Sequence, residues 1–194
     1  TPLYSSAASD VYKRQDSYHD YRGHENGEFP LGDFSEERFE NYALFCDSLK
    51  LKLETIDSYG LEENDLISYK LLHFVLKETG VKYHYKTHWN PILSDAGFHS
   101  NLTYIVRPIS SKKSALKYLN LLKAIPLYID QQSTLIEKGL NAGMGQPLII
   151  FNGYSSTYKQ HITKTPEENF YYSPFLKLPD QISKQEKDSL LSLI

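Results

Sequence analysis

Apolar residues recur at helical spacing in two neighbouring segments near the start of the chain. From residue 35 to about residue 59 they fall on one face of a helix, and Ser35 is a residue type favoured at helix starts. Residues 62–79 repeat the pattern and are followed by Gly80, a residue type common just after a helix. Because only a few residues separate the two segments, we predict an antiparallel helical hairpin.

The pattern changes to alternation after Gly80. In the run VKYHYKTHWN, residues 81–90, every second side chain would lie on one side of an extended chain. An Asn-Pro pair then favours a turn, and the polar, glycine-containing residues 94–101 favour a loop. We therefore predict a short extended or loop segment near residues 81–109.

A long amphipathic segment predicts a third helix, which Ser110 or Ser111 can cap and which runs to about Gly139. Pro126 lies inside this segment. Proline removes one backbone donor and crowds the carbonyl four residues earlier, so we expect a kink near Leu122.

Gly139, Gly143 and Gly145 follow this helix, and we interpret them as either a hinge or a close-packed corner. Pro147 then introduces the apolar residues 148–162, which predict a further helix because proline suits the first helical turn.

The C-terminal part mixes helix signals with prolines. Residues 165–168, TPEE, are typical of a helix start, whereas Pro174 and Pro179 are expected to bracket a loop. Ser183, followed three residues later by Glu186, has the pattern of a capping box before a final helix. We expect this helix to be still running at the last residue, as in a fragment of a longer protein.

The first residues show no hydrophobic periodicity. Residues 5–15, SSAASDVYKRQ, resemble translated adapter sequence from sequencing libraries, so we expect residues 1–15 to lie outside the native fold; a natural disordered tail is the alternative. Residues 16–33 are polar and contain Gly and Pro, which predicts an extended segment. Residues 34–194 predict a mainly α, multi-helix domain that is incomplete at its C-terminus.

Composition is that of an ordinary globular domain, with 40% hydrophobic and 23% charged residues. The net charge of −3 does not require a basic face, so we predict no nucleic-acid partner. No apolar run reaches the roughly 18 residues of a transmembrane helix, so we predict no membrane-spanning segment. Cys46 is the one cysteine, which excludes an internal disulfide, and its apolar surroundings predict a buried thiol. The oligomeric state is not predicted.

His84 and His88 are four residues apart. On a helix two such imidazoles can share a metal ion, but on the predicted extended segment they would lie about 13 Å apart. The sequence offers no acidic third ligand at a telling spacing, and structural or surface histidines are the favoured interpretation. The zinc-binding HExxH pattern does not occur, so no metal ligand and no catalytic residue is assigned.

Three residues are candidates for substrate binding: His99, Trp89 and Asn101. His99 follows a glycine on a predicted loop, where an imidazole can hydrogen-bond a substrate carbonyl or carboxylate; the alternative is that it satisfies loop backbone groups. Trp89 is interpreted as a loop anchor or as the wall of a pocket.

Four blocks of this chain resemble a bacterial family catalogued as domain of unknown function 885. They are the NPILxxxGFH block at residues 90–99, LNLLKAIPLYIDQ at 119–131, GLxAGxxQP at 139–147 and the later SPFLKLPDQISKQEKDSL. Together they cover about residue 34 to the C-terminus, and it is their order and spacing that make the match specific.

The resemblance implies a longer, mostly helical protein, exported or lipid-anchored, whose catalytic half is similar to zinc metallopeptidases of the HExxH type. In such a site two histidines bind zinc, and the glutamate acts as general base toward the zinc-bound water. Because HExxH is missing here, it would lie beyond Ile194, and none of its roles carries over to a residue of this chain. The resemblance thus implies no cofactor in this fragment, zinc and a peptide substrate in the full-length protein, and an inactive fragment.

Three functional hypotheses follow. In the first, the chain is the N-terminal helical part of a zinc-dependent peptidase and forms one wall of its substrate cleft, with residues 89–101 facing the cleft. In the second, it is a non-catalytic helical domain that binds a peptide or protein partner. In the third, His84, His88 and His99 form an isolated metal or hydrolase site.

Overall fold

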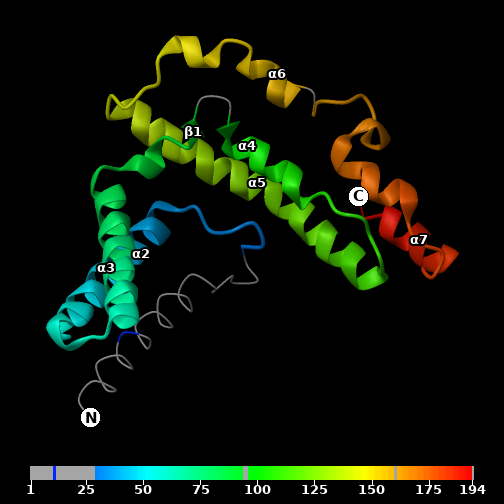
Figure 1. The fold of residues 1–194 in the computed structure, drawn as a ribbon. Coiled ribbons are helices and arrows are strands. Elements are labelled where there is room, and N and C mark those ends of the chain that lie inside the picture. Colours follow the sequence, from blue (N-terminus) through cyan, green and yellow to red (C-terminus); the bar gives the residue numbers. More distant parts are fainter. Residues whose placement is uncertain (1–10, 12–28, 94–95, 160, 194) are drawn as a thin grey trace. The chain divides into compact units, whose positions relative to one another are not determined.

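The computed structural model describes residues 11, 29–93, 96–159 and 161–193, and within them the fold is mainly α, as predicted (Figure 1). The chain divides into two compact units. In described residues, the first holds residue 11 and residues 33–88, and the second holds residues 29–32 together with those from Trp89 onward. The expectations for residues 1–15, and for most of 16–33, fall outside the described residues.

A helical hairpin makes up the first unit, which confirms the prediction. It consists of α2, Glu36–Glu54, and α3, Glu63–His84. Ser35 caps α2, because its hydroxyl accepts a hydrogen bond from the Arg38 amide at 3.2 Å. The two helices pack along a seam of buried side chains that includes Cys46, Leu49, Leu53, Leu72 and Leu76.

The predicted extended segment after Gly80 is wrong, because α3 continues to His84. A Cβ atom on Gly80 would lie 3.0 Å from the Asp47 carboxylate, so this glycine fits a close contact between the two helices and does not end α3. The chain leaves the helix at Lys86, whose φ of 54° is in the left-handed region. A 3-10 turn, Thr87–Trp89, follows.

The second unit opens with small elements in place of the predicted loop. Strands β1, Ile92–Leu93, and β2, Ala96–Gly97, pair antiparallel, and α4, Phe98–Asn101, and a 3-10 turn, Leu102–Ile105, come directly after them. Residues 94–95 lie outside the described residues. Among the described residues near 81–109, the extended or loop conformation is therefore found in strands β1 and β2 and in residues 106–109, and not in residues 81–84.

Helix α5, Lys112–Asn141, begins as predicted at Ser111. The hydroxyls of Ser111 and Ser114 each accept a hydrogen bond from the other residue's amide, at 3.2 and 2.9 Å, which forms a capping box. The helix continues through Pro126, and the kink expected near Leu122 stays a prediction.

The end of α5 is a Schellman motif. Gly143 has a φ of 77°, its amide donates to the Leu140 carbonyl at 3.0 Å, and the Met144 amide donates to the Gly139 carbonyl at 2.8 Å. A Cβ atom on Gly139 would lie 2.6 Å from the Trp89 carbonyl oxygen. Gly139 is therefore a close-packed corner, one of the two interpretations offered by the sequence.

The remaining elements are short. The predicted helix 148–162 is broken into a 3-10 turn, Leu148–Phe151, and helix α6, Tyr154–Lys159, because Gly153 between them has a φ of 77°. Further 3-10 segments are Pro166–Glu168 and Phe170–Lys177. The second of these contains Pro174, so the loop expected to start at this proline is wrong.

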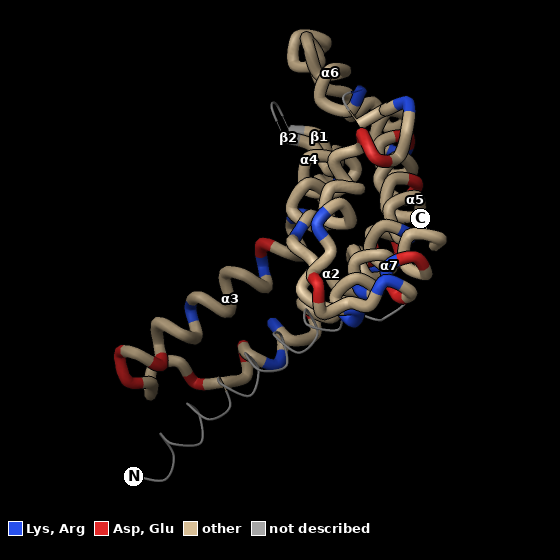
Figure 2. The backbone as a smooth tube through the Cα atoms, turned by 90° about the vertical axis from the view of Figure 1, so that its right-hand side faces the viewer, with Lys and Arg blue, Asp and Glu red and all other residues tan. Residues whose placement is uncertain are grey.

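Helix α7, Lys184–Leu191, has the predicted capping box between Ser183 and Glu186. It ends at Leu191, so the expectation that it is still running at the last residue is wrong. Its Leu190 joins the core of the second unit. This core gathers side chains of α5, of α7, of the 3-10 segment with Phe175 and of residues that precede the two helices: Ile109, Ala115, Tyr118, Leu119, Phe175, Ile182 and Leu190. Figure 2 shows Lys and Arg interspersed with Asp and Glu along the described backbone.

Candidate functional site

His99 lies in α4, immediately after strand β2, and both nitrogens of its ring are hydrogen-bonded to α6. Nδ1 is 3.1 Å from the Tyr154 hydroxyl, and Nε2 is 2.7 Å from the Thr157 hydroxyl. Tyr154 and Thr157 share one face of α6 because they are three residues apart. This i, i+3 spacing was the one signal in the sequence that could have pointed to these two residues, which sequence reasoning missed.

The hydroxyl protons determine which nitrogen of His99 carries hydrogen. The Thr157 hydroxyl donates its single proton to the Tyr154 carbonyl at 2.6 Å, so it accepts from His99 Nε2–H. Nδ1 is then the acceptor, and the Tyr154 hydroxyl donates to it. The inferred state of His99 is therefore the neutral Nε2–H tautomer.

The pKa values of this pair agree with that assignment. Burial, together with the nearby His161, lowers the pKa of His99 from its ordinary value of 6.5. Burial, together with Tyr158, raises the pKa of Tyr154, which keeps its hydroxyl a donor. The rings of Tyr154 and Tyr158 lie edge-on to His99, at centroid distances of 5.0 and 6.2 Å. His99 is therefore held in one orientation by α6.

Gly97 makes this arrangement possible. A Cβ atom at this position would occupy the place of the Tyr154 hydroxyl and would lie 3.0 Å from the His99 ring. The glycine in the AGFH block is thus needed for the close approach of α6 to the hairpin.

His161 is a second imidazole near this group. Its ring lies 5.3 Å from that of Tyr171, and its carbonyl accepts a hydrogen bond from the Asn169 amide group at 2.8 Å. Its Nδ1 is buried and has no hydrogen-bond partner among the described residues. Sequence reasoning did not single out His161.

Asn101 and Trp89, the other two substrate-binding candidates, lie in different surroundings. Asn101 lies near Tyr128 and lowers its pKa against the larger raising effect of burial, while the Tyr128 hydroxyl donates to the Phe98 carbonyl at 2.9 Å. Trp89 packs on Gly139 of α5. Gly139 lies eleven residues after Tyr128, which corresponds to about 16 Å along the helix. The structure therefore does not bring the three candidates together: His99 contacts α6, Asn101 lies near Tyr128 of α5, and Trp89 packs at the end of α5.

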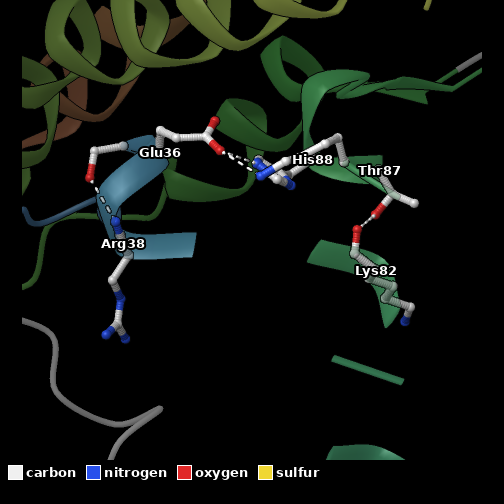
Figure 3. A network of polar contacts seen from close by, with 7 residues as sticks. Glu36, Arg38, Lys82, Thr87 and His88 are labelled. Atoms are coloured by element: carbon white, nitrogen blue, oxygen red, sulfur yellow. Dashed lines mark hydrogen bonds and ion pairs between the residues drawn. The ribbon is translucent and has the colours of Figure 1, made fainter. Parts of the chain in front are cut away.

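His88 lies in the first unit and is bound by protein groups (Figure 3). Its Nε2 is 3.2 Å from Glu36 Oε1, and its ring stacks on Phe39 and Tyr83 at centroid distances of 4.4 and 5.4 Å. Only 6% of its side chain is exposed. The amine of Lys86 also reaches Glu36, at 3.4 Å. This supports the structural interpretation of His88.

Across the described ranges, no group of three His, Cys, Asp or Glu side chains could hold a metal ion. His84 ends α3, where its ring lies edge-on to Tyr85 at 5.1 Å. The third hypothesis, a metal site of His84, His88 and His99, therefore has no cluster in this part of the chain to support it.

Comparison with known proteins places the chain in a family. A family model described as "Bacterial protein of unknown function (DUF885)" matches residues 18–193. The chain belongs to this family. The match also takes in residues 18–33, which the resemblance seen in the sequence did not include. No curated protein and no solved structure matches the chain.

The family assignment leaves the finer expectations as predictions: zinc, peptide substrate, and export or lipid anchoring. In the described part of this DUF885 chain, no helix is both long and apolar enough to cross a membrane.

Proposed function

We propose that this DUF885 chain is the helical part of a zinc-dependent peptidase and forms one wall of its substrate cleft. The observation that carries the proposal is the state of His99, a neutral imidazole fixed in one tautomer on a four-residue helix. Once its two hydrogen bonds to α6 are released, a neutral imidazole can exchange hydrogen bonds with a peptide group at neutral pH. The peptide substrate comes from the family resemblance.

Zinc has no fitting donor set in the described residues, since no three potential ligands come together there. No hydrolytic step is therefore assigned to a residue of this chain. In the proposal, this chain contributes substrate binding. Asn101 and His99 orient the substrate from α4, while Trp89 packs against the end of α5 and holds the start of the β1–β2 hairpin there.

The reading frame extended past Ile194 provides the test. With zinc present, the longer protein should cleave a fluorogenic peptide library, and the 194-residue chain should not. His99→Ala should lower kcat/KM about tenfold, mainly through KM, because it removes one substrate hydrogen bond. His84→Ala is the matched control, and its kinetics should equal those of the unsubstituted protein. Absence of cleavage by the zinc-loaded longer protein would refute the peptidase proposal.

A partner-binding helical domain is the second candidate, and the outer face of α3 favours it. Ile67, Leu71 and Phe74 are 50–60% exposed. Val81, 37% exposed, continues the same face one heptad after Phe74. A stripe of this kind on a helix is typical of a surface that another element covers. A stop codon soon after Ile194 in the natural reading frame would favour this candidate over the peptidase.

A further inference from the structure

Residues 144–159, here called the strap, have no core of their own. They comprise the 3-10 turn Leu148–Phe151 and helix α6, and none of their side chains is buried. Leu148 and Ile149 are 85% and 74% exposed. A segment that buries so little apolar surface opens at low free-energy cost, because local stability follows buried contacts.

Two features N-terminal to α6 permit such an opening. Directly before the helix, Gly153 has a φ of 77° and open space around the position of a Cβ atom. Before the 3-10 turn, the strap is joined to the hairpin by a weak hydrogen bond of 3.4 Å from the Gln146 amide group to the Ile92 carbonyl. The hydrogen bond that His99 accepts from Tyr154, at 3.1 Å, and the one it donates to Thr157, at 2.7 Å, are shorter.

We infer that the strap is a self-blocking lid, closed by a latch in which Tyr154 and Thr157 occupy the two hydrogen-bonding positions of His99. In the closed state Nδ1 and Nε2 both have partners within the chain, so His99 cannot bind a ligand. When α6 turns about Gly153, one acceptor and one donor are released together. A ligand that binds His99 must then compete with the strap. The latch itself does not rest on the proposed peptidase activity.

Hydrogen exchange on the 194-residue chain tests the latch. Tyr154→Phe should speed exchange of the α6 amides about fivefold, the effect of losing one net hydrogen bond. Thr157→Val should speed it at least as much, because it also removes the hydrogen bond from the Thr157 hydroxyl to the Tyr154 carbonyl within α6. Tyr158→Phe is the matched control: it removes a hydroxyl from the same helix, from a ring that lies 6.2 Å from that of His99, and should leave the rates unchanged.

Amides in the first half of α5 serve as the internal reference for global stability. Their exchange should stay the same in all three variants. If exchange in α5 rises by the same factor as exchange in α6, the hydrogen bonds of Tyr154 and Thr157 to His99 stabilise the whole second unit, and the latch is refuted. Unchanged α6 rates in the Tyr154 and Thr157 variants, or equal acceleration by Tyr158→Phe, would overturn it as well.

Discussion

At the scale of single residues, Gly97 sets the geometry around His99. Any side chain there would take the place of the Tyr154 hydroxyl. The AGFH block therefore requires a glycine before the histidine as well as the histidine itself. The sequence could not reveal this, because Tyr154 is 57 positions away, and only folding brings the two together.

Gly97→Ala should destabilise the second unit by about 1–3 kcal/mol, the usual cost of overpacking. The same substitution in a Tyr154→Phe background should cost less, because the hydroxyl that occupies the space is gone. Urea unfolding of the four proteins gives the coupling free energy. If Gly97→Ala lowers the free energy of unfolding equally with Tyr154 and with Phe at that position, the added methyl group does not clash with the Tyr154 hydroxyl.

His99 should also make the second unit less stable in mild acid. Its pKa is lowered in the folded chain, so folding favours the neutral ring. This stabilisation is present above about pH 6.5, the unfolded value, and is lost as pH falls through the lower folded value. The charge of His161 acts on His99 in the same direction as burial.

Urea midpoints between pH 8 and pH 5 check this expectation. The midpoint should fall toward pH 5, and His99→Gln should reduce that fall. A midpoint with the same pH dependence in the variant would assign the effect to another histidine.

At the scale of elements, the sequence predicted the starts of three helices correctly but wrongly placed the end of α3 at Gly80. Ser35, Ser111 and Ser183 cap helices as predicted, because a cap needs only residues within one turn. Gly80 lies inside α3, close to the Asp47 carboxylate, whereas α5 ends two residues after the predicted Gly139.

Gly139→Ala should disturb the end of α5, because its methyl group would meet backbone rather than a movable side chain. Because the added Cβ atom would lie 2.6 Å from the Trp89 carbonyl oxygen, we expect the free energy of unfolding to fall by about 1–3 kcal/mol. Trp89 is the single tryptophan, so its fluorescence reports the change directly. Gly145→Ala, with 3.8 Å to its neighbour, is the control and should leave emission unchanged. A Gly139→Ala protein with native emission and stability would contradict the close-packed corner.

At the scale of the whole molecule, large apolar side chains lie exposed in both units. In the first unit, Phe74 is 60% exposed, whereas Leu76, two residues later on the same helix, is fully buried. Leu76→Ala should cost 2–5 kcal/mol of stability and Phe74→Ala less than about 0.5 kcal/mol. Thermal unfolding measures both, and dye binding or self-association should fall only in the Phe74 variant. A large stability loss from Phe74→Ala would mean that this face already packs within the chain.

The sequence by itself determined the mainly α fold, the hairpin of α2 and α3, the helix starts and the family, because these depend on periodicity, on caps and on the order of short blocks. Tertiary structure decided the rest. The alternating residues 81–84 form the last turn of α3, because Gly80 packs close to Asp47 of α2 and the helix does not end there. Tertiary structure also gave His99 its partners from α6, more than fifty residues away, because a hydrogen bond depends on distance in space and leaves no trace in local spacing.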